Sequence, residues 1–275
     1  MSGTDEAKTA DFTIALDLDG VVWRGRRVIP GSAEAVLALR EAGLRVGFVS
    51  NNSTAPIGAV VDRLRRAGVQ ADPSEVITSA QAAAAQMRSV LPEGAAVLVV
   101  GETGISEALA DVGLSPVASH SGRRVAGVIA GLDTAFDYAA LDAALQAIWS
   151  GARFIATNTD PTLPVEDGAR PGSGAIVSAI ATASGVDPHV AGKPHPPIAR
   201  LVRTRLGETG VVVGDRPDTD GALADTLGWP FALVLSGVTA DARQSGADIV
   251  ADDLRGLVPA LLEAAGRPVS ADPGR

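Results

Sequence analysis

Short apolar runs alternate along this chain with stretches whose apolar residues recur at helical spacing. The run from Phe12 to Asp17 precedes a helical pattern near Ser32 to Ala42, and the run from Arg45 to Ser50 precedes another near Pro56 to Ala67. Strand, helix, strand, helix in this order is typical of a parallel sheet with crossover helices. The pattern therefore predicts an α/β fold from its first quarter onward.

The helix predicted at Pro56 to Ala67 has the clearest periodicity. Its apolar residues fall at i, i+3, i+4 and i+7, namely Ile57, Val60, Val61 and Leu64. This spacing predicts one buried face, with Pro56 suited to the first turn and Gly68 to the stop. Arg63, Arg65 and Arg66 share this helix, and we expect them to form its solvated side rather than a binding patch.

The middle of the chain shows the same alternation of strand-like and helical stretches. We expect strands and helices at Ala95–Val100, around Ser106, at Val125–Ala130, at Tyr138–Trp149 and at Arg153–Thr157. The runs Val211–Gly214 and Phe231–Leu235 then resume the strand, helix, strand order, as if the chain returned to its first sheet. The sequence thus predicts two α/β units, one inserted within the other.

Composition and charge narrow the range of possible functions. The chain has 275 residues, a formal net charge of -9 and no cysteine. The acidic balance argues against nucleic acid as a partner, because such binding rests on clustered Lys and Arg. The missing cysteines exclude disulfides, thiolate zinc sites and thiol catalysis. Residues 1–11 lack an apolar leader region and no run is long enough to cross a bilayer, so we expect no membrane association and a cytoplasmic location.

Two carboxylates follow the first predicted strand, in Leu16-Asp17-Leu18-Asp19-Gly20. If the strand ends near Asp17 and the chain turns at Gly20, both side chains approach one site. A carboxylate is a sufficient nucleophile toward a phosphoryl group whose charge a metal neutralises, which suits Asp17. Asp19 is then placed to protonate the leaving oxygen and to deprotonate water afterwards. Alone, this pair is also typical of a turn or cap.

Two further segments offer groups for phosphate. Ser50 and Asn51 follow the strand Arg45 to Val49, where a hydroxyl and backbone N–H groups suit phosphoryl oxygens, while Ser53 or Thr54 suits a helix cap. Lys193 stands between Gly192 and Pro194, which predicts a fixed cation able to offset carboxylates and a phosphate.

A fourth polar segment, Gly214 to Asp220, follows the strand-like run Val211 to Val213. Asp215 at the strand tip, with Asp17 and the backbone carbonyl of Asp19, supplies hard oxygen ligands that suit Mg²⁺. Asp220 is expected to support the metal or Lys193, whereas Asp218 is expected to be only a helix N-cap. All four segments follow strands, where open α/β sheets build their ligand sites.

Taken together, these segments resemble the haloacid dehalogenase superfamily of phosphatases, whose four motifs appear in order as DLDG, SNNS, GKP and GDRPDTD. The stretches GLDTAFDY, GARFIATNTD and PGSGAI resemble its NagD and p-nitrophenylphosphatase-like branch. The resemblance implies a Rossmann-like core with an inserted α/β cap and hydrolysis of small phosphate monoesters with Mg²⁺. It implies Asp17 as nucleophile, Asp19 as acid and base, Ser50 and Asn51 as phosphate ligands and Lys193 as stabilising cation. It implies Asp215 and Asp220 as the carboxylates that bind or support the metal.

The cap is expected between the second and third motifs. We expect residues 81–184 to form it, and residues 1–80 and 185–275 to form the catalytic core. Inside it, Asn158 and Asp160 follow the strand Arg153 to Thr157 and are predicted to read the substrate's leaving group, although a plain turn fits as well. The expected partner is a small phosphorylated metabolite such as glycerol phosphate, phosphoglycolate, a nucleotide or pyridoxal phosphate. A homodimer is the expected assembly.

Three alternatives stay open at this point. A signalling receiver also uses a phosphorylated Asp, Mg²⁺, a hydroxyl and a Lys, but it needs neither Asp19 nor a long insertion before Lys193. A mutase with the same fold and site residues would transfer the phosphoryl group to a second sugar hydroxyl. A binding module without catalysis would have no reason to retain every chemical group.

Overall fold

The computed structural model describes residues 12–119, 121–165 and 168–267. The chain forms two compact units, one of residues 1–49, 63–76 and 199–275 and the other of residues 50–62 and 77–198. Residues 77–198 make up most of the second unit. His189–Val190 pairs with a strand of this unit. The bounds expected for the cap, residues 81–184, stay a prediction.

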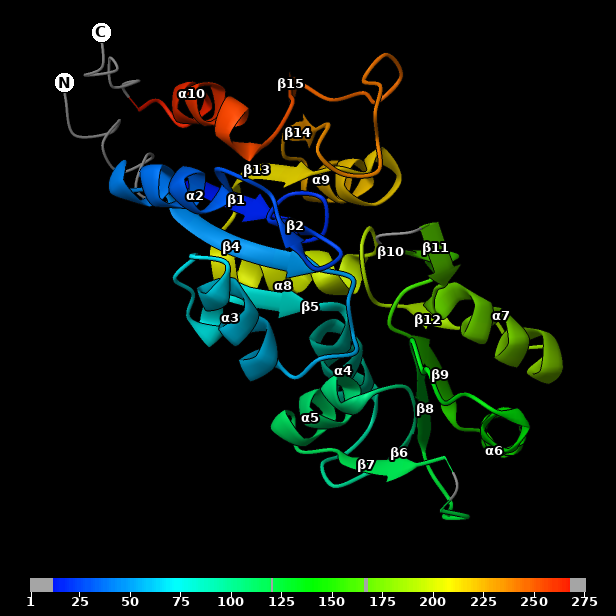
Figure 1. Cartoon of the computed structure of the whole chain (residues 1–275). Coiled ribbons are helices and arrows are strands. Elements are labelled where there is room, and N and C mark those ends of the chain that lie inside the picture. Colours follow the sequence, from blue (N-terminus) through cyan, green and yellow to red (C-terminus); the bar gives the residue numbers. More distant parts are fainter. Residues whose placement is uncertain (1–11, 120, 166–167, 268–275) are drawn as a thin grey trace, which may run out of the picture. The chain divides into compact units, whose positions relative to one another are not determined.

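The first unit is built on a six-stranded sheet in the order β15-β14-β13-β1-β4-β5 (Figure 1). Its strands are β1 Phe12–Leu16, β4 Arg45–Ser50, β5 Val76–Thr78, β13 Thr209–Gly214, β14 Phe231–Val234 and β15 Ile249–Ala251. The pairs β1 with β4, β1 with β13, β13 with β14 and β14 with β15 are all parallel. The predicted parallel α/β sheet is confirmed.

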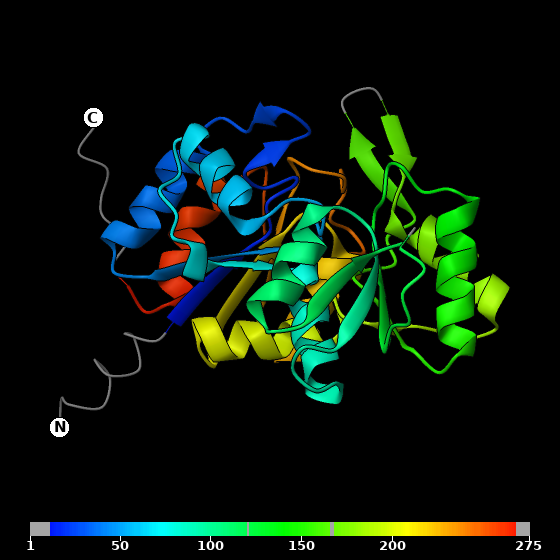
Figure 2. The same ribbon diagram turned by 90° about the horizontal axis from the view of Figure 1, so that it is seen from below.

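Helices cover this sheet on both faces, which explains why β1 and β13 are apolar on both sides. The helical elements are α2 Ser32–Glu41, α3 Ile57–Arg66, α8 Pro196–Leu206, α9 Ala222–Leu227 and α10 Leu254–Ala264, with short turns at Pro73–Glu75 and Pro217–Gly221. Figure 2 shows α2 and α10 on one face and α8 on the other. A small hairpin, β2 Trp23–Arg24 and β3 Arg27–Val28, follows β1.

The predicted helix α3 has its buried face, with Val61 and Leu64 inside. Arg65 and Arg66 are exposed, as expected for a solvated side. Arg63 corrects that expectation, because it is half-buried and its guanidinium lies 3.9 Å from the centre of the Trp23 ring. The helix therefore contacts the hairpin that follows β1.

The second unit contains a five-stranded sheet in the order β12-β9-β8-β6-β7, all of whose pairs are parallel. Its strands are β6 Ala96–Val100, β7 Ser115–Ala118, β8 Gly127–Ala130, β9 Arg153–Ala156 and β12 His189–Val190, with a separate antiparallel hairpin of β10 Thr162–Val165 and β11 Gly168–Pro171. Helices α4 Ser79–Val90 and α5 Thr103–Asp111 lie on one face, and α6 Tyr138–Trp149 and α7 Ser173–Ser184 on the other (Figures 1 and 2). Each unit thus has its own three-layer core.

Local signals set the ends of these helices. The Asp137 carboxylate accepts from the Ala140 N–H at 2.8 Å and so caps α6, and Thr78 with Gln81 forms a capping box at the start of α4. Gly185 ends α7 in the left-handed conformation that glycine adopts without strain. None of the described helices is both long and apolar enough to cross a bilayer.

Candidate active site

The first unit's sheet reverses its strand order between β1 and β13. From β1 the chain proceeds through β4 to β5 on one side, and from β13 through β14 to β15 on the other. Ligands of open α/β sheets bind at such a switch point, beyond the carboxyl ends of the strands. Asp17 directly follows β1, and its N–H donates to the Val213 carbonyl of β13 at 2.8 Å. Asp215 directly follows β13, so both carboxylates stand at this point.

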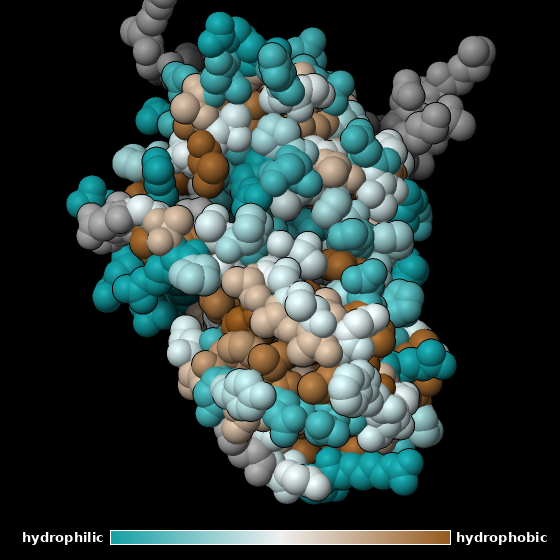
Figure 3. All heavy atoms as spheres, turned by 90° about the vertical axis from the view of Figure 1, so that its right-hand side faces the viewer, coloured by the Kyte–Doolittle hydropathy of each residue, from teal (hydrophilic) through white to brown (hydrophobic). Residues whose placement is uncertain are grey.

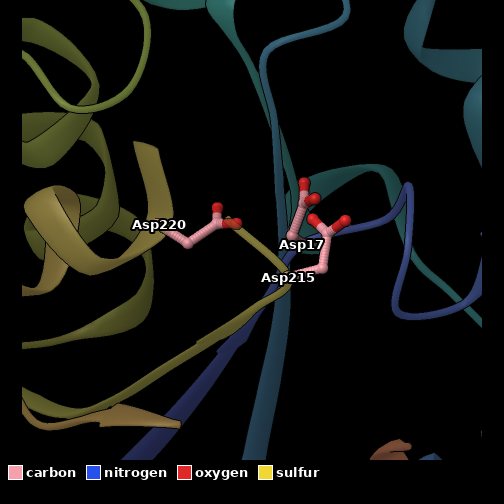
Figure 4. A group of neighbouring side chains, drawn as sticks. All are labelled: Asp17, Asp215 and Asp220. Carbon is pink, nitrogen blue, oxygen red and sulfur yellow. The ribbon is translucent and has the colours of Figure 1, made fainter. Parts of the chain in front are cut away.

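Three carboxylates meet there. Asp17, Asp215 and Asp220 each offer an oxygen within 4.8 Å of the others, and their exposed fractions are 9%, 2% and 1% (Figure 4). Such close, buried negative charges repel one another and are costly without a cation. Clustered carboxylate oxygens are the donor set that Mg²⁺ prefers. The donors thus fit a hard divalent cation, and sequence reasoning had named all three residues.

Asp215 is held in place by residues that have no functional side chain. The Val238 N–H donates to Asp215 Oδ2 at 2.6 Å. A β-carbon at Gly20 or at Gly237 would overlap the Asp215 side chain, and Gly20 also has φ near +88°. Only glycine therefore fits at these two positions. Gly237 was missed from the sequence, because its contact with Asp215 joins segments far apart in the chain.

Asp220 is oriented by the turn that precedes it. The Arg216 N–H donates to Asp220 Oδ2 at 3.1 Å, and a β-carbon at Gly214 would overlap the Asp220 carboxylate. The helix N-cap role expected for Asp218 is wrong, because Arg216 and Gly221 occupy the cap positions of this segment and α9. Asp218 is instead an exposed partner of the Arg216 guanidinium at 2.7 Å, and the pKa of its carboxyl is lowered by that hydrogen bond.

Asp19 is set apart from the three clustered carboxylates. Among the described side chains, the cluster consists of Asp17, Asp215 and Asp220. The Asp19 carboxylate accepts a hydrogen bond from the Trp23 indole at 3.0 Å. Its contribution to the metal through the backbone carbonyl stays a prediction.

In the second unit, Asn51 and Lys193 are joined directly. The Lys193 N–H donates to Asn51 Oδ1 at 2.7 Å, and Asn51 Nδ2 donates to the Lys193 carbonyl at 3.2 Å. A β-carbon at Gly192 would overlap Asn51 Oδ1, so glycine is needed before the lysine. Lys193 is buried, with 5% of its surface exposed. The expectation of a fixed lysine is in accord with this clamp.

Asn158 and Asp160 belong to the same network. Asn158 Nδ2 donates to the Asn51 carbonyl at 2.8 Å, and its Oδ1 accepts from Ser173 Oγ at 2.5 Å and from the Asp160 N–H at 3.0 Å. Asn51 Nδ2 also donates to Asp160 Oδ2 at 3.2 Å. The side chain of Asn158 is 4% exposed and binds its own chain, which favours the plain structural role over substrate reading. Asp160 is half-buried and stays the candidate for specificity.

Two further residues named from the sequence, Ser50 and His195, are both at least half-buried. Ser50 is the last residue of β4 and is buried, and its Oγ accepts from the Asn52 N–H at 3.1 Å. Ser50 thus ends its strand rather than following it, and its phosphate role stays a prediction. His195 is half-buried, its N–H donates to the Gly192 carbonyl, and burial lowers the pKa of its imidazole.

Known proteins share this fold and these segments. Residues 14–115 match the family described as haloacid dehalogenase-like hydrolase, and residues 190–257 match the HAD-hydrolase-like family. The D-glycerol 3-phosphate phosphatase of Mycobacterium tuberculosis is 40% identical over 226 residues, which are 82% of this chain and 63% of that protein. The chain therefore spans less than two thirds of that relative's length.

Two solved structures extend the likeness over most of the chain. A glycerol phosphate phosphatase from Mycobacterium tuberculosis in complex with magnesium superposes with a TM-score of 0.81 at 36% identity, covering 97% of this chain and 82% of that one. The p-nitrophenyl phosphatase from Archaeoglobus fulgidus gives a TM-score of 0.82 at 33% identity, covering 91% and 99%. The chain belongs to the haloacid dehalogenase-like hydrolases, and the predicted resemblance is confirmed.

Proposed function

We propose that this protein is a Mg²⁺-dependent phosphatase that hydrolyses small phosphate monoesters through a phospho-aspartate on Asp17. The observation that carries the proposal is the buried group of Asp17, Asp215 and Asp220 at the switch point of the sheet. Its relatives' activities support the same class of substrate, a glycerol phosphate in one and an aryl phosphate in another. A polyol or sugar phosphate is the natural first substrate to test.

Asp17 and Asp19 have different roles in the proposed reaction. Asp17 attacks phosphorus, the bond from phosphorus to the leaving oxygen breaks, and Asp19 gives its proton to that oxygen. Asp19, now ionised, takes a proton from the water that attacks the phosphorus of the phospho-aspartate, which releases phosphate and restores Asp17. A bound Mg²⁺ neutralises charge on the phosphoryl oxygens. Asp17 and Asp215 would hold it through side chains and Asp19 through its carbonyl, with Asp220 supporting them.

Ser50, Asn51 and Lys193 are proposed to bind the phosphoryl oxygens. Lys193 is buried and its backbone is held by the Asn51 side chain, which supports a fixed cation for a phosphoryl oxygen. The side-chain amide of Asn51 is already engaged with Lys193 and Asp160. We therefore assign phosphate binding to the Asn51 backbone N–H and the holding of Lys193 to its side chain.

Phosphate release from a panel of metabolite esters tests the proposal. Excess chelator should abolish turnover and added Mg²⁺ should restore it, because the three carboxylates would otherwise repel the substrate. Full turnover in excess chelator would contradict the mechanism. In the same assay, an isomerised sugar phosphate without free phosphate would identify a mutase, and a single phosphorylation without turnover would identify a receiver.

A homodimer is the proposed assembly, and α6 offers a surface for it. Tyr138 and Trp149 lie on one face of α6, because they are eleven positions apart, and their exposed fractions are 83% and 65%. Figure 3 views the molecule from the side of α6 and α7 and shows apolar groups among polar ones on this part. Sedimentation of the wild type and of Trp149→Glu tests the assembly. A monomeric wild type would reject it.

A further inference from the structure

The segment after the proposed nucleophile folds into one compact turn. The Leu18 carbonyl accepts from the N–H groups of Val21, Val22 and Trp23, and the Gly20 N–H donates to the Trp23 carbonyl at 2.6 Å. This turn returns Trp23 to Asp19, and the two residues also form an isolated parallel bridge. The Trp23 indole then donates to Asp19 Oδ1 at 3.0 Å. Trp23 is 2% exposed, so its ring is fixed where that donor is required.

Arg63 of α3 stacks over the face of the indole. Its guanidinium lies 3.9 Å from the centre of the Trp23 ring, within cation-π range, and its Nη2 donates to the Gly25 carbonyl in the hairpin turn. Burial lowers the pKa of Arg63, while the charge of Asp19 raises it. Asp19, Trp23 and Arg63 therefore form one stacked and charged unit, built from the first motif, the hairpin and α3.

We propose that Trp23 is a positioning residue for Asp19, which fixes the carboxyl so that its Oδ2 delivers the proton to the leaving oxygen. This inference rests on the acid and base role proposed for Asp19. An indole N–H donates only, and the carbonyl oxygen of a neutral carboxyl is a stronger acceptor than its hydroxyl oxygen, so the contact favours the proton on the other oxygen. The proton is therefore directed to Oδ2. The hydrogen bond also removes rotation about the carboxyl, and such placement is a large part of general acid catalysis.

Leaving groups of different basicity test this role. An alkoxide from glycerol phosphate needs a proton as it departs, whereas p-nitrophenolate departs without one. Trp23→Phe keeps the ring over Arg63 and removes the N–H. In single turnovers stopped by acid, we expect Trp23→Phe to slow phospho-aspartate formation from glycerol phosphate by at least about tenfold, and from p-nitrophenyl phosphate by less than about twofold.

The chain supplies a matched control in Trp229. It is 7% exposed and its indole donates to the Glu208 carbonyl at 2.9 Å, so Trp229→Phe loses an equally buried hydrogen bond away from Asp19. Trp229→Phe should leave the ratio of the two rates unchanged. Arg63→Met, which frees the ring without removing it, should lower the glycerol phosphate rate in the same selective way and keeps the test open if Trp23→Phe does not fold.

Indole N–H resonances give a readout that does not depend on turnover. The chain has three tryptophans, each assignable by its Phe variant. Asp19→Asn should shift the Trp23 resonance and leave those of Trp149 and Trp229 in place. Equal slowing on both esters, no slowing on either, or a Trp23 resonance unmoved by Asp19→Asn would overturn the inference. If the wild type hydrolyses neither ester, the proposed function fails while the resonance still tests the contact.

Discussion

At the scale of single residues, the arrangement of the carboxylates depends on neighbours that carry no charge. Asp215 lies between Gly20 and Gly237, and Asp220 lies against Gly214. A side chain at any of these glycines would occupy the volume of a carboxylate. The acidic groups can therefore approach one another only because the adjoining backbone lacks β-carbons.

Replacing Gly237 by alanine should displace Asp215 without removing any chemical group. Its β-carbon would overlap Asp215 Oδ2, and a misplacement of about 1 Å near the chemistry can cost roughly 10²-fold in rate. We expect Gly237→Ala to lower kcat by about that factor and to raise the Mg²⁺ concentration needed for half-maximal activity. Gly58→Ala on α3 is the control, because nothing lies within 4 Å of its added β-carbon. Equal activity of both variants would contradict this account of Asp215.

The two carboxylates of the first motif should differ in what they abolish. Asp17→Asn should prevent any covalent phosphate, because the neutral amide that replaces the carboxylate is too weak a nucleophile to attack phosphorus. Asp19→Asn should still accept phosphate slowly from an aryl ester, but should lose the proton transfers of both steps. Intact-protein mass spectrometry after mixing with substrate distinguishes them. A phosphorylated Asp17→Asn protein would disprove the nucleophile assignment.

At the scale of elements, the sequence was most informative where periodicity is long or strands are fully apolar. The helix Tyr138–Trp149 and the strand Arg45–Ser50 have the expected bounds, and the remaining predicted strands differ by a residue or two at their ends. Short strands such as His189–Val190 and Ile249–Ala251 were missed. Two or three residues contain no periodicity, and they become strands only because a neighbouring strand offers its backbone groups.

The candidate site was predictable to the same extent and for a related reason. Asp17, Asp215 and Asp220 could be named because polar residues after apolar strands collect at one edge of a parallel sheet. Trp23, Arg63 and Asn158 have their roles through contacts between segments distant in the chain or through a turn. A linear sequence does not display such contacts, so Arg63 was expected in solvent and Asn158 on the substrate.

The loop after β9 offers a test that separates support from recognition. Asn158→Ala should leave the Ser173 hydroxyl and the Asp160 N–H without their acceptor, at a cost of about 1 to 3 kcal/mol in the free energy of unfolding. The Asn51 carbonyl would keep its second donor, Ser79 Oγ at 2.6 Å. Asp160→Ala should change that free energy less and alter the order of preference among metabolite esters. Urea unfolding and the ester panel measure the two effects. If Asn158→Ala kept its stability but changed the order of preference among the esters, Asn158 would have the role in substrate recognition.

At the scale of the whole molecule, the chain path crosses between the two units several times. The chain passes from one unit to the other at 49/50, 62/63, 76/77 and 198/199. The first of these passages lies within β4, directly before Ser50 of the second motif, and the last lies within α8, shortly after Lys193 of the third motif. The inserted unit is therefore joined to the core through the segments that carry the proposed phosphate ligands. The proposal that the inserted unit acts as a cap on the substrate rests on this chain path.

A cap joined in this way should restrict the enzyme to small substrates. Closing over the site excludes bulk water and bulky leaving groups, and it needs room only for a metabolite. We expect glycerol phosphate and other small esters to be hydrolysed with a kcat/KM at least about 10³-fold above that for a folded phosphoprotein carrying phosphoserine. A short phosphoserine peptide is the matched control, because it has the same leaving group without the folded bulk. If the peptide and the phosphoprotein were hydrolysed as fast as the metabolites, the proposed cap would be rejected. If the peptide were hydrolysed well and the phosphoprotein were not, the size of the folded substrate would be what limits hydrolysis.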